Sequence, residues 1–156
     1  MFQRHLIAKI SVVVLCLTWD GVALAKPPPV VDELVANAKA AVKTIDMQAF
    51  RALLDQPDHG FIIDVREPDE FATGHVPGAV NIPRGVIEFR IWTLIDYPTN
   101  APADVKLTLY CKSGGRCALA AKSLKELGFV KATAVDMTLK NWVDAGYPMT
   151  EPELQF

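Results

Sequence analysis

The sequence predicts an α/β fold, in which a parallel sheet of about five short strands carries helices on both faces. Short apolar runs alternate along the chain with segments whose apolar residues recur at helical spacing. The run FIIDV at residues 61–65 is typical of a strand that is buried on both faces of a sheet. The chain has 156 residues, 51% hydrophobic and 22% charged, which is enough for one domain with a sizeable core.

Residues 1–25 have the features of a secretory signal peptide. Arg4, His5 and Lys9 form a basic start, an uncharged run of ten residues follows, and residues 23–25 (ALA) match the pattern of a cleavage site. A membrane-spanning helix needs about 20 apolar residues, so we expect no stable membrane span after cleavage. An uncleaved N-terminal anchor is the alternative. The signal predicts export, to the periplasm of a bacterium.

The segment after the signal, residues 26–43, is expected to form a linker and an N-terminal helix. The run KPPP at residues 26–29 predicts a stiff, extended linker. Apolar residues then recur at helical spacing over residues 32–42. The main domain is assigned to residues 44–150, and a short C-terminal tail to residues 151–156.

Strands and helices are expected to alternate throughout the main domain. The strands are predicted at residues 44–45, 61–65, 80–82, 106–110 and 132–135. Asp46 can cap a helix, Pro68 suits the first turn of another, and Gly128 is a good C-terminal cap residue. The helices are predicted after Asp46, from Pro68, over much of residues 85–94, at residues 117–127 and at residues 139–145.

Chemistry is expected where the strand at residues 106–110 ends, because ligands bind at the carboxyl ends of parallel strands. Cys111 follows that strand, and Gly114 and Gly115 allow a tight loop before the next helix. Backbone N–H groups in such a loop can bind an anion, and the helix N-terminus adds partial positive charge. These surroundings lower the pKa of a thiol, which makes Cys111 the candidate nucleophile. A small buried residue at a strand end is the alternative interpretation.

Two motifs resemble the rhodanese family of thiosulfate and persulfide sulfurtransferases. One is DVREPDEFATGHVPGAVNIP at residues 64–83, and the other is CKSGGR at residues 111–116. The resemblance extends from residue 44 to residue 148 and implies a single rhodanese-like α/β domain. It further implies that the loop binding the substrate and the persulfide consists of Lys112, Ser113, Gly114, Gly115 and Arg116.

The resemblance implies an enzyme of the thiosulfate:cyanide sulfurtransferase class that needs no metal or organic cofactor. Cys111 takes a sulfur atom from a donor such as thiosulfate or a persulfide and holds it as a persulfide. A thiol or cyanide then accepts the sulfur, and the thiol can belong to another protein. Lys112 either attracts the anionic donor or is simply solvated.

Other functions remain open. A related phosphatase loop is one residue longer and has arginine at the position of Cys117. Rhodaneses often carry a glycine pair before a tryptophan of the last helix, whereas this chain has Met137 and Thr138 there. These bulkier residues leave open a non-catalytic binding or redox-sensing module. The chain has 16 basic and 18 acidic residues, a net charge of -2, which argues against nucleic-acid binding.

By resemblance, the residues Asp64, Arg66 and Glu70 are expected to support the loop. We interpret Arg66 and Glu70, four residues apart, as an ion pair that orients the following turn, with a secondary electrostatic effect on the loop. We interpret His75 as structural, because the family mechanism needs no general base once the thiolate has formed.

Two of the three cysteines, Cys111 and Cys117, remain after removal of the signal, which contains Cys16. In an oxidising compartment, two nearby thiols can form a disulfide. Cys117 is therefore either a small, serine-like packed residue or a resolving thiol that closes a disulfide with Cys111.

Overall fold

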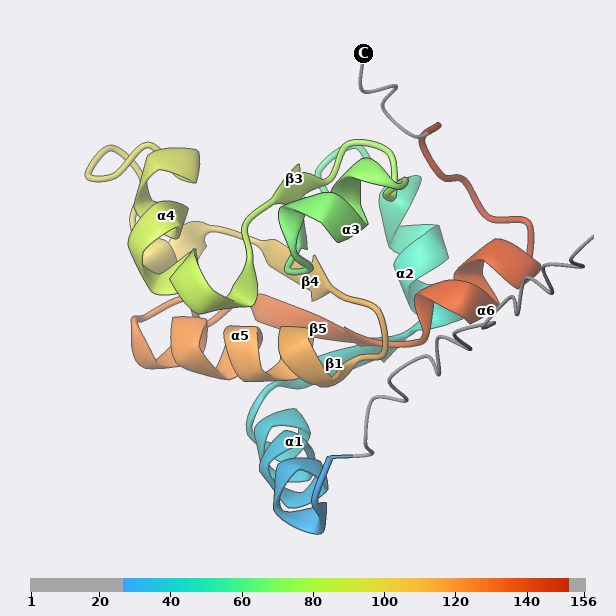
Figure 1. The fold of residues 1–156 in the computed structure, drawn as a ribbon. Helices are drawn as coiled ribbons and strands as arrows, with labels where there is room; N and C mark the ends of the chain where they lie inside the picture. Colours follow the sequence, from blue (N-terminus) through green and yellow to red (C-terminus); the bar gives the residue numbers. More distant parts are fainter. Residues whose placement is uncertain (1–26, 152–156) are drawn as a thin grey trace, which may run out of the picture.

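The computed structural model describes residues 27–151, so the predicted signal peptide lies outside the described residues. Five parallel strands form one sheet in the order β1-β5-β4-β2-β3 (Figure 1). The strands are β1 (Lys43–Asp46), β2 (Phe61–Asp64), β3 (Val80–Asn81), β4 (Leu107–Tyr110) and β5 (Ala132–Asp136). The predicted fold class, a parallel α/β sheet with helices on both faces, is confirmed.

Helices connect the strands close to where the sequence predicts them. They are α1 (Pro29–Ala41), α2 (Met47–Leu54), α3 (Pro68–Ala72), α4 (Ile87–Leu94), α5 (Gly115–Glu126) and α6 (Leu139–Asp144), with 3₁₀ turns η1 (Arg84–Val86) and η2 (Pro102–Asp104). Pro29 begins α1 instead of extending the linker, because the fixed φ of proline suits the first position of a helix. Asp46 caps α2 as predicted, and its Oδ1 accepts a hydrogen bond from the N–H of Ala49 at 2.8 Å.

The sheet has a hydrophobic core on each face. Consecutive residues of β2 point to opposite faces, so Ile62 and Ile63 belong to different cores. Ile62 shares its core with Phe50 of α2 and Trp142 of α6, whereas Ile63 shares the other core with α4 and α5. Burial on both faces explains why β2 has no polar alternation in its sequence.

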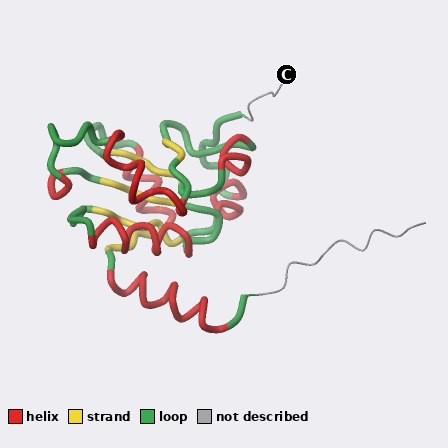
Figure 2. Tube along the Cα trace, turned by 60° about the vertical axis from the view of Figure 1, so that its left-hand side comes forward, coloured by secondary structure: helices red, strands yellow, loops and turns green. Residues whose placement is uncertain are grey.

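The N-terminal helix α1 lies at one side of the domain (Figure 2). Ala38 is its one completely buried residue, while Val30 and Leu34 are more than half exposed. The helix packs against α5. Within residues 27–151, no helix combines the length and apolar character that are needed to cross a membrane.

The carboxyl ends of the strands meet at one edge of the sheet. Asp64 at the end of β2 is in register with Tyr110 at the end of β4, and Asp46 with Asp136 at the ends of β1 and β5. Cys111, the residue after β4, therefore lies between the ends of β2 and β5, because β4 is the strand between them.

Candidate active site

The loop after β4 is a tight turn that leads directly into α5. Cys111 follows the strand, and the helix begins at Gly115. Gly114 has a φ of +81°, in the left-handed region, and a Cβ atom at this position lies 3.0 Å from Oδ1 of Asp136. A side chain at position 114 therefore strains the backbone and also meets a carboxylate, so the turn requires glycine here.

The thiol of Cys111 lies beneath this loop, with 1% of the residue exposed. Its pKa is lowered from 9.0 to about 6. The hydrogen bond from the Cys117 thiol is the main cause, and the backbone N–H groups of Cys117, Ser113 and Gly114 act in the same direction, whereas burial opposes them. The thiolate, which is the nucleophilic form, is therefore favoured at this position.

Cys117 lies in the first turn of α5, completely buried, with its sulfur 3.6 Å from the sulfur of Cys111. The same sulfur is 3.2 Å from the carbonyl oxygen of Gly114 and 3.4 Å from that of Val135. A thiol has one proton, and an ionised Cys111 is the only charged acceptor among these three. The hydrogen bond with Cys111, together with burial, raises the pKa of Cys117. Cys117 therefore stays protonated while Cys111 is ionised.

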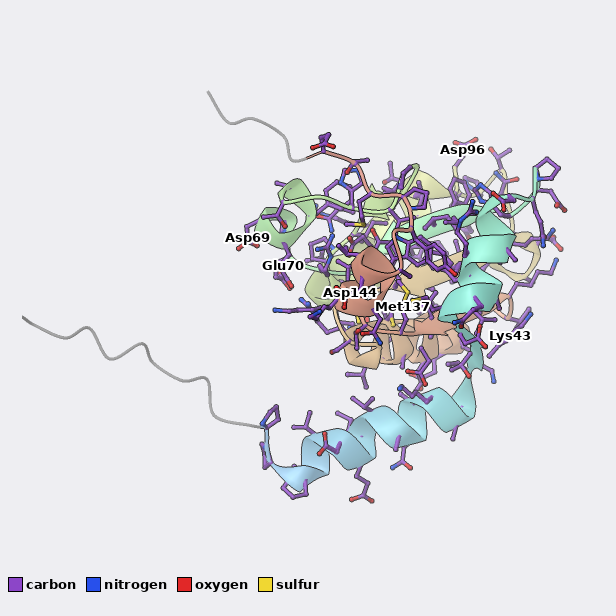
Figure 3. The ribbon with its side chains drawn as sticks, turned by 90° about the vertical axis from the view of Figure 1, so that its right-hand side faces the viewer. Lys43, Asp69, Glu70, Asp96, Met137 and Asp144 are labelled. Atoms are coloured by element: carbon purple, nitrogen blue, oxygen red, sulfur yellow. The ribbon has the colours of Figure 1, made fainter. Side chains whose placement is uncertain are left out.

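Arg116 forms a two-pronged ion pair with Glu70 of α3, at 2.6 Å from Nη1 to Oε2 and 2.9 Å from Nη2 to Oε1. The arginine lowers the pKa of Glu70 from 4.5 to about 2. Our expectation that Glu70 pairs with Arg66 is wrong, because Nη1 of Arg66 donates to the backbone carbonyl of Glu70 instead. The carboxylate of Glu70, which is labelled in Figure 3, instead pairs with Arg116 and so links α3 to the first turn of α5.

Arg66 instead pairs with Asp64, in a salt bridge that is almost completely buried. Its Nη2 lies 2.6 Å from Oδ2 of Asp64, and its Nε lies 2.9 Å from the same oxygen. Nη2 also donates to the carbonyl of Gly74 at 2.8 Å. Because Arg66 bonds to Asp64 and also to the carbonyls of Glu70 in α3 and of Gly74 just after it, it holds α3 and the following turn against the end of β2.

The sequence profile of the Rhodanese-like domain matches residues 46–145. The chain belongs to the rhodanese family. The matched region includes β2 to β5 and the whole Cys111 loop, whereas α1 precedes it. The family resemblance inferred from residues 64–83 and 111–116 is thereby confirmed.

The chain is similar to several proteins and solved structures. A sulfurtransferase from Allochromatium vinosum is 27% identical over 112 residues, which are 72% of this chain and 98% of the relative. A putative sulfur carrier protein from Bacillus subtilis is 31% identical over 103 residues, 66% of this chain and 52% of the relative, so the chain spans about half of that protein. A structure from Rhodopseudomonas palustris, of unknown function and described as a possible tyrosine phosphatase, is 30% identical with a TM-score of 0.65, covering 77% of this chain and 93% of its own.

An open cleft of about 720 Å³ lies beside the rhodanese loop. α3 contributes Glu70 to its lining, the loop contributes Lys112 and Ser113, and α6 contributes Leu139 and Val143. The backbone N–H of Leu139 donates to the carbonyl of Lys112 at 2.9 Å, which fixes α6 against the loop. The cleft therefore combines a lysine with an apolar wall directly beside the turn that covers Cys111.

Met137 and Thr138, the two bulky residues before α6, have different surroundings, because one lies in a core and the other lines the cleft. Met137, labelled in Figure 3, is 7% exposed and belongs to the core that contains Trp142. Thr138 lines the cleft, and its Oγ1 accepts a hydrogen bond from the N–H of Asn141, which caps α6. Only Thr138 of the two therefore narrows the cleft.

His75 lies three residues after the end of α3. Its ring stacks on Phe71, with centroids 3.6 Å apart, and its Nδ1 is 3.2 Å from the carbonyl oxygen of Phe71. Its backbone groups bond to Thr150. It is absent from the residues that line the cleft, and its structural role stays a prediction.

Three further residues near the loop, Lys39, Tyr110 and Asp136, have no motif in the sequence that marks them. Lys39 of α1 forms an ion pair of 2.5 Å with Asp136, the residue whose carboxylate lies against Gly114. The hydroxyl of Tyr110 accepts a hydrogen bond at 3.0 Å from the N–H of Val76, in the loop between α3 and β3. Asp136 and Tyr110 each end a parallel strand, and residues at the carboxyl ends of such strands are candidates for a functional site. The position of Lys39 depends on tertiary packing alone.

Proposed function

We propose that this rhodanese is a sulfurtransferase that moves a sulfane sulfur from a donor such as thiosulfate to a thiophilic acceptor. One observation carries the proposal: a cysteine with a pKa of about 6 lies directly beneath a turn whose backbone N–H groups converge on its sulfur. Such a site both creates a thiolate and stabilises a negatively charged adduct of it.

In the first step, the thiolate of Cys111 attacks the outer sulfur of thiosulfate. The new bond joins the two sulfurs, and sulfite leaves with the electron pair of the broken S–S bond. Lys112, exposed at the edge of the cleft, raises the local concentration of the dianionic donor. The N–H groups of Ser113, Gly114 and Cys117 then bond to the charged persulfide.

In the second step, the acceptor attacks the outer sulfur of the persulfide. With cyanide the product is thiocyanate, and with a thiol it is a new persulfide. The electron pair of the broken bond returns to Cys111, so no net oxidation of the enzyme takes place. The cleft, with its apolar wall of Leu139 and Val143, has room for an acceptor larger than cyanide.

The test is sulfur transfer from thiosulfate to cyanide by the mature chain under reducing conditions. We expect turnover in the wild type and only the uncatalysed background in Cys111→Ser, because a hydroxyl forms no persulfide. Circular dichroism checks that both proteins are folded. If both are folded and neither transfers sulfur from thiosulfate or from an organic persulfide, the non-catalytic binding module becomes the better proposal.

A phosphatase is the second candidate, because of the description attached to the Rhodopseudomonas palustris structure. The loop argues against it, since position 117 holds a buried cysteine and Arg116 is paired with Glu70. We expect no hydrolysis of p-nitrophenyl phosphate. Hydrolysis that disappears in Cys111→Ser would reverse this assignment.

We also propose that the domain works after export, to the periplasm of a bacterium. The proposal rests on the order of features within residues 1–25, which lie outside the described residues. N-terminal sequencing of the protein recovered from the cell envelope is expected to begin at Lys26. A sequence that begins at Met1 would contradict cleavage.

A further inference from the structure

We propose that Cys117 is a resolving thiol that discharges the Cys111 persulfide within the same chain, releasing hydrosulfide and leaving a Cys111–Cys117 disulfide. This inference rests on the proposed function, because it begins from the persulfide. It gives the bound sulfur a second route of release, as hydrosulfide, that needs no external acceptor.

The geometry is that of two thiols in contact. The sulfurs are 3.6 Å apart, and a disulfide bond is about 2.05 Å long, so closure needs a movement of about 1.5 Å. Within residues 27–151, Cys111 and Cys117 are the free cysteines, and both are buried. A thiol from outside must pass the loop to reach Cys111, whereas Cys117 is already beside it.

The chemistry balances without an added oxidant. The sulfur of Cys117 attacks the inner sulfur of the persulfide, which is the original sulfur of Cys111. A bond forms between the two cysteine sulfurs, and the bond to the outer sulfur breaks with its electron pair. The proton of Cys117 goes to the departing sulfur, which leaves as hydrosulfide. The outer sulfur is reduced, and the two cysteines are oxidised.

The electrostatics of the pair set the order of events. While Cys111 is a thiolate, the raised pKa of Cys117 keeps that thiol protonated, so Cys111 reacts with the donor. Persulfide formation moves the negative charge to the outer sulfur, one bond further from Cys117. The hydrogen bond to the Cys111 thiolate, which is the main cause of the raised pKa of Cys117, is lost at that point, so the Cys117 thiol can give its proton to the outer sulfur as it attacks.

The outcome of each turnover therefore depends on competition. An acceptor in the cleft beside Lys112 and Ser113 takes the outer sulfur and regenerates the thiolate. When acceptor is scarce, Cys117 closes the disulfide and activity stops. A dithiol reductant then restores both thiols by exchange, so the reaction couples activity to the supply of acceptor and reductant.

The test follows one turnover of the mature chain. Reduced protein, freed of reductant without oxygen, receives one equivalent of thiosulfate and no acceptor, and intact-mass spectrometry and a sulfide assay follow the reaction. We expect the wild type to lose two hydrogens and to release about one sulfide per chain. We expect Cys117→Ser to gain one sulfur atom and to release less than about a tenth as much sulfide.

The two proposals fail in different ways. If neither protein gains sulfur or releases sulfite, the proposed sulfurtransferase function fails with this donor. If the wild type gains one sulfur atom and keeps it, the function stands and the resolving role of Cys117 is wrong. Because this second outcome is read from the wild type, it holds even if Cys117→Ser does not fold. Dithiothreitol is expected to restore the original mass of the wild type.

Discussion

At the scale of single residues, the contact between Cys111 and Cys117 sets the pKa of Cys111, the proposed nucleophile. The Cys117 thiol is the largest contribution to the lowered pKa of Cys111, ahead of the backbone N–H groups of the loop. A serine at position 117 retains a small side chain with one donor, whereas alanine has none. The pair of variants therefore separates the hydrogen bond from the packing of the site.

We predict that Cys117→Ala raises the pKa of Cys111 above 6 toward the ordinary value of 9.0, and that Cys117→Ser raises it less. The thiolate forms as the pH rises through the pKa, so persulfide formation is lost as the pH falls below it. The measurement is the ultraviolet absorbance of the thiolate against pH, with Cys111→Ser as the blank. An equal midpoint in wild type and Cys117→Ala would mean that backbone N–H groups alone set the pKa.

The ion pair between Glu70 and Arg116 is expected to stabilise the fold in a defined pH range. The pKa of Glu70 is lowered in the folded state, so its contribution is complete above the ordinary value of 4.5 and is lost as the pH falls toward 2. We predict that Glu70→Gln costs about 1 kcal/mol at neutral pH, because both side chains are partly exposed.

Urea unfolding of wild type and Glu70→Gln at several pH values checks this prediction, and the difference is expected to shrink as the solution is acidified. Glu88→Gln is the matched control. Glu88 of α4 pairs with Arg84 on the 3₁₀ turn before it, and the side chains of this pair are about as exposed as those of Glu70 and Arg116. A difference in stability between wild type and Glu70→Gln that does not change with pH would contradict the assignment of this carboxylate.

At the scale of elements, the turn between β4 and α5 is held by its neighbours on both sides. Asp136 at the end of β5 lies against Gly114, and Lys39 of α1 pairs with Asp136. Gly115 packs against Val35 of α1, because a Cβ atom there lies 3.4 Å from this side chain. α1 precedes the region that defines the family, yet it supports the turn that covers Cys111.

We predict that Gly114→Ala costs about 1–2 kcal/mol of stability from backbone strain, displaces the loop N–H groups and raises the pKa of Cys111. Gly78→Ala is the matched control, since Gly78 has a φ of +78° with open space around it. Both variants should lose stability in urea unfolding, but only Gly114→Ala should slow persulfide formation. An equal effect on that rate would show that strain alone is responsible.

At the scale of the whole molecule, the two cores are coupled through the one sheet that separates them. Trp92 packs against the core that contains α4 and α5, and Trp142 belongs to the core that contains α2 and α6. Phe50 is completely buried, with its ring centroid 5.1 Å from that of Trp142. Both cores are therefore expected to unfold together.

We predict that Phe50→Ala costs about 3–5 kcal/mol and that both cores report the same loss. The measurement is urea unfolding of residues 26–156 followed by fluorescence, with Trp92→Phe or Trp142→Phe leaving one tryptophan in each reporter. Coincident midpoints are expected with and without Phe50→Ala. Two separate transitions would mean that each face of the sheet unfolds alone.

The sequence by itself determined the order of strands and helices, the cap at Asp46 and the position of Cys111 at a strand end. These features depend on neighbouring residues, through periodicity, capping and turn chemistry, so a local reading recovers them. The motifs at residues 64–83 and 111–116 are likewise contiguous in the sequence, and they are sufficient to identify the rhodanese family.

Only the tertiary structure decided which side chains meet. Arg116 pairs with Glu70 across 46 positions, and Lys39 with Asp136 across 97. The spacing of four residues predicts a pair of Arg66 with Glu70, but Arg66 pairs with the buried carboxylate of Asp64. Pairing between distant residues depends on the path of the whole chain, because the order of the strands in the sheet, and not their order in the sequence, brings such residues together.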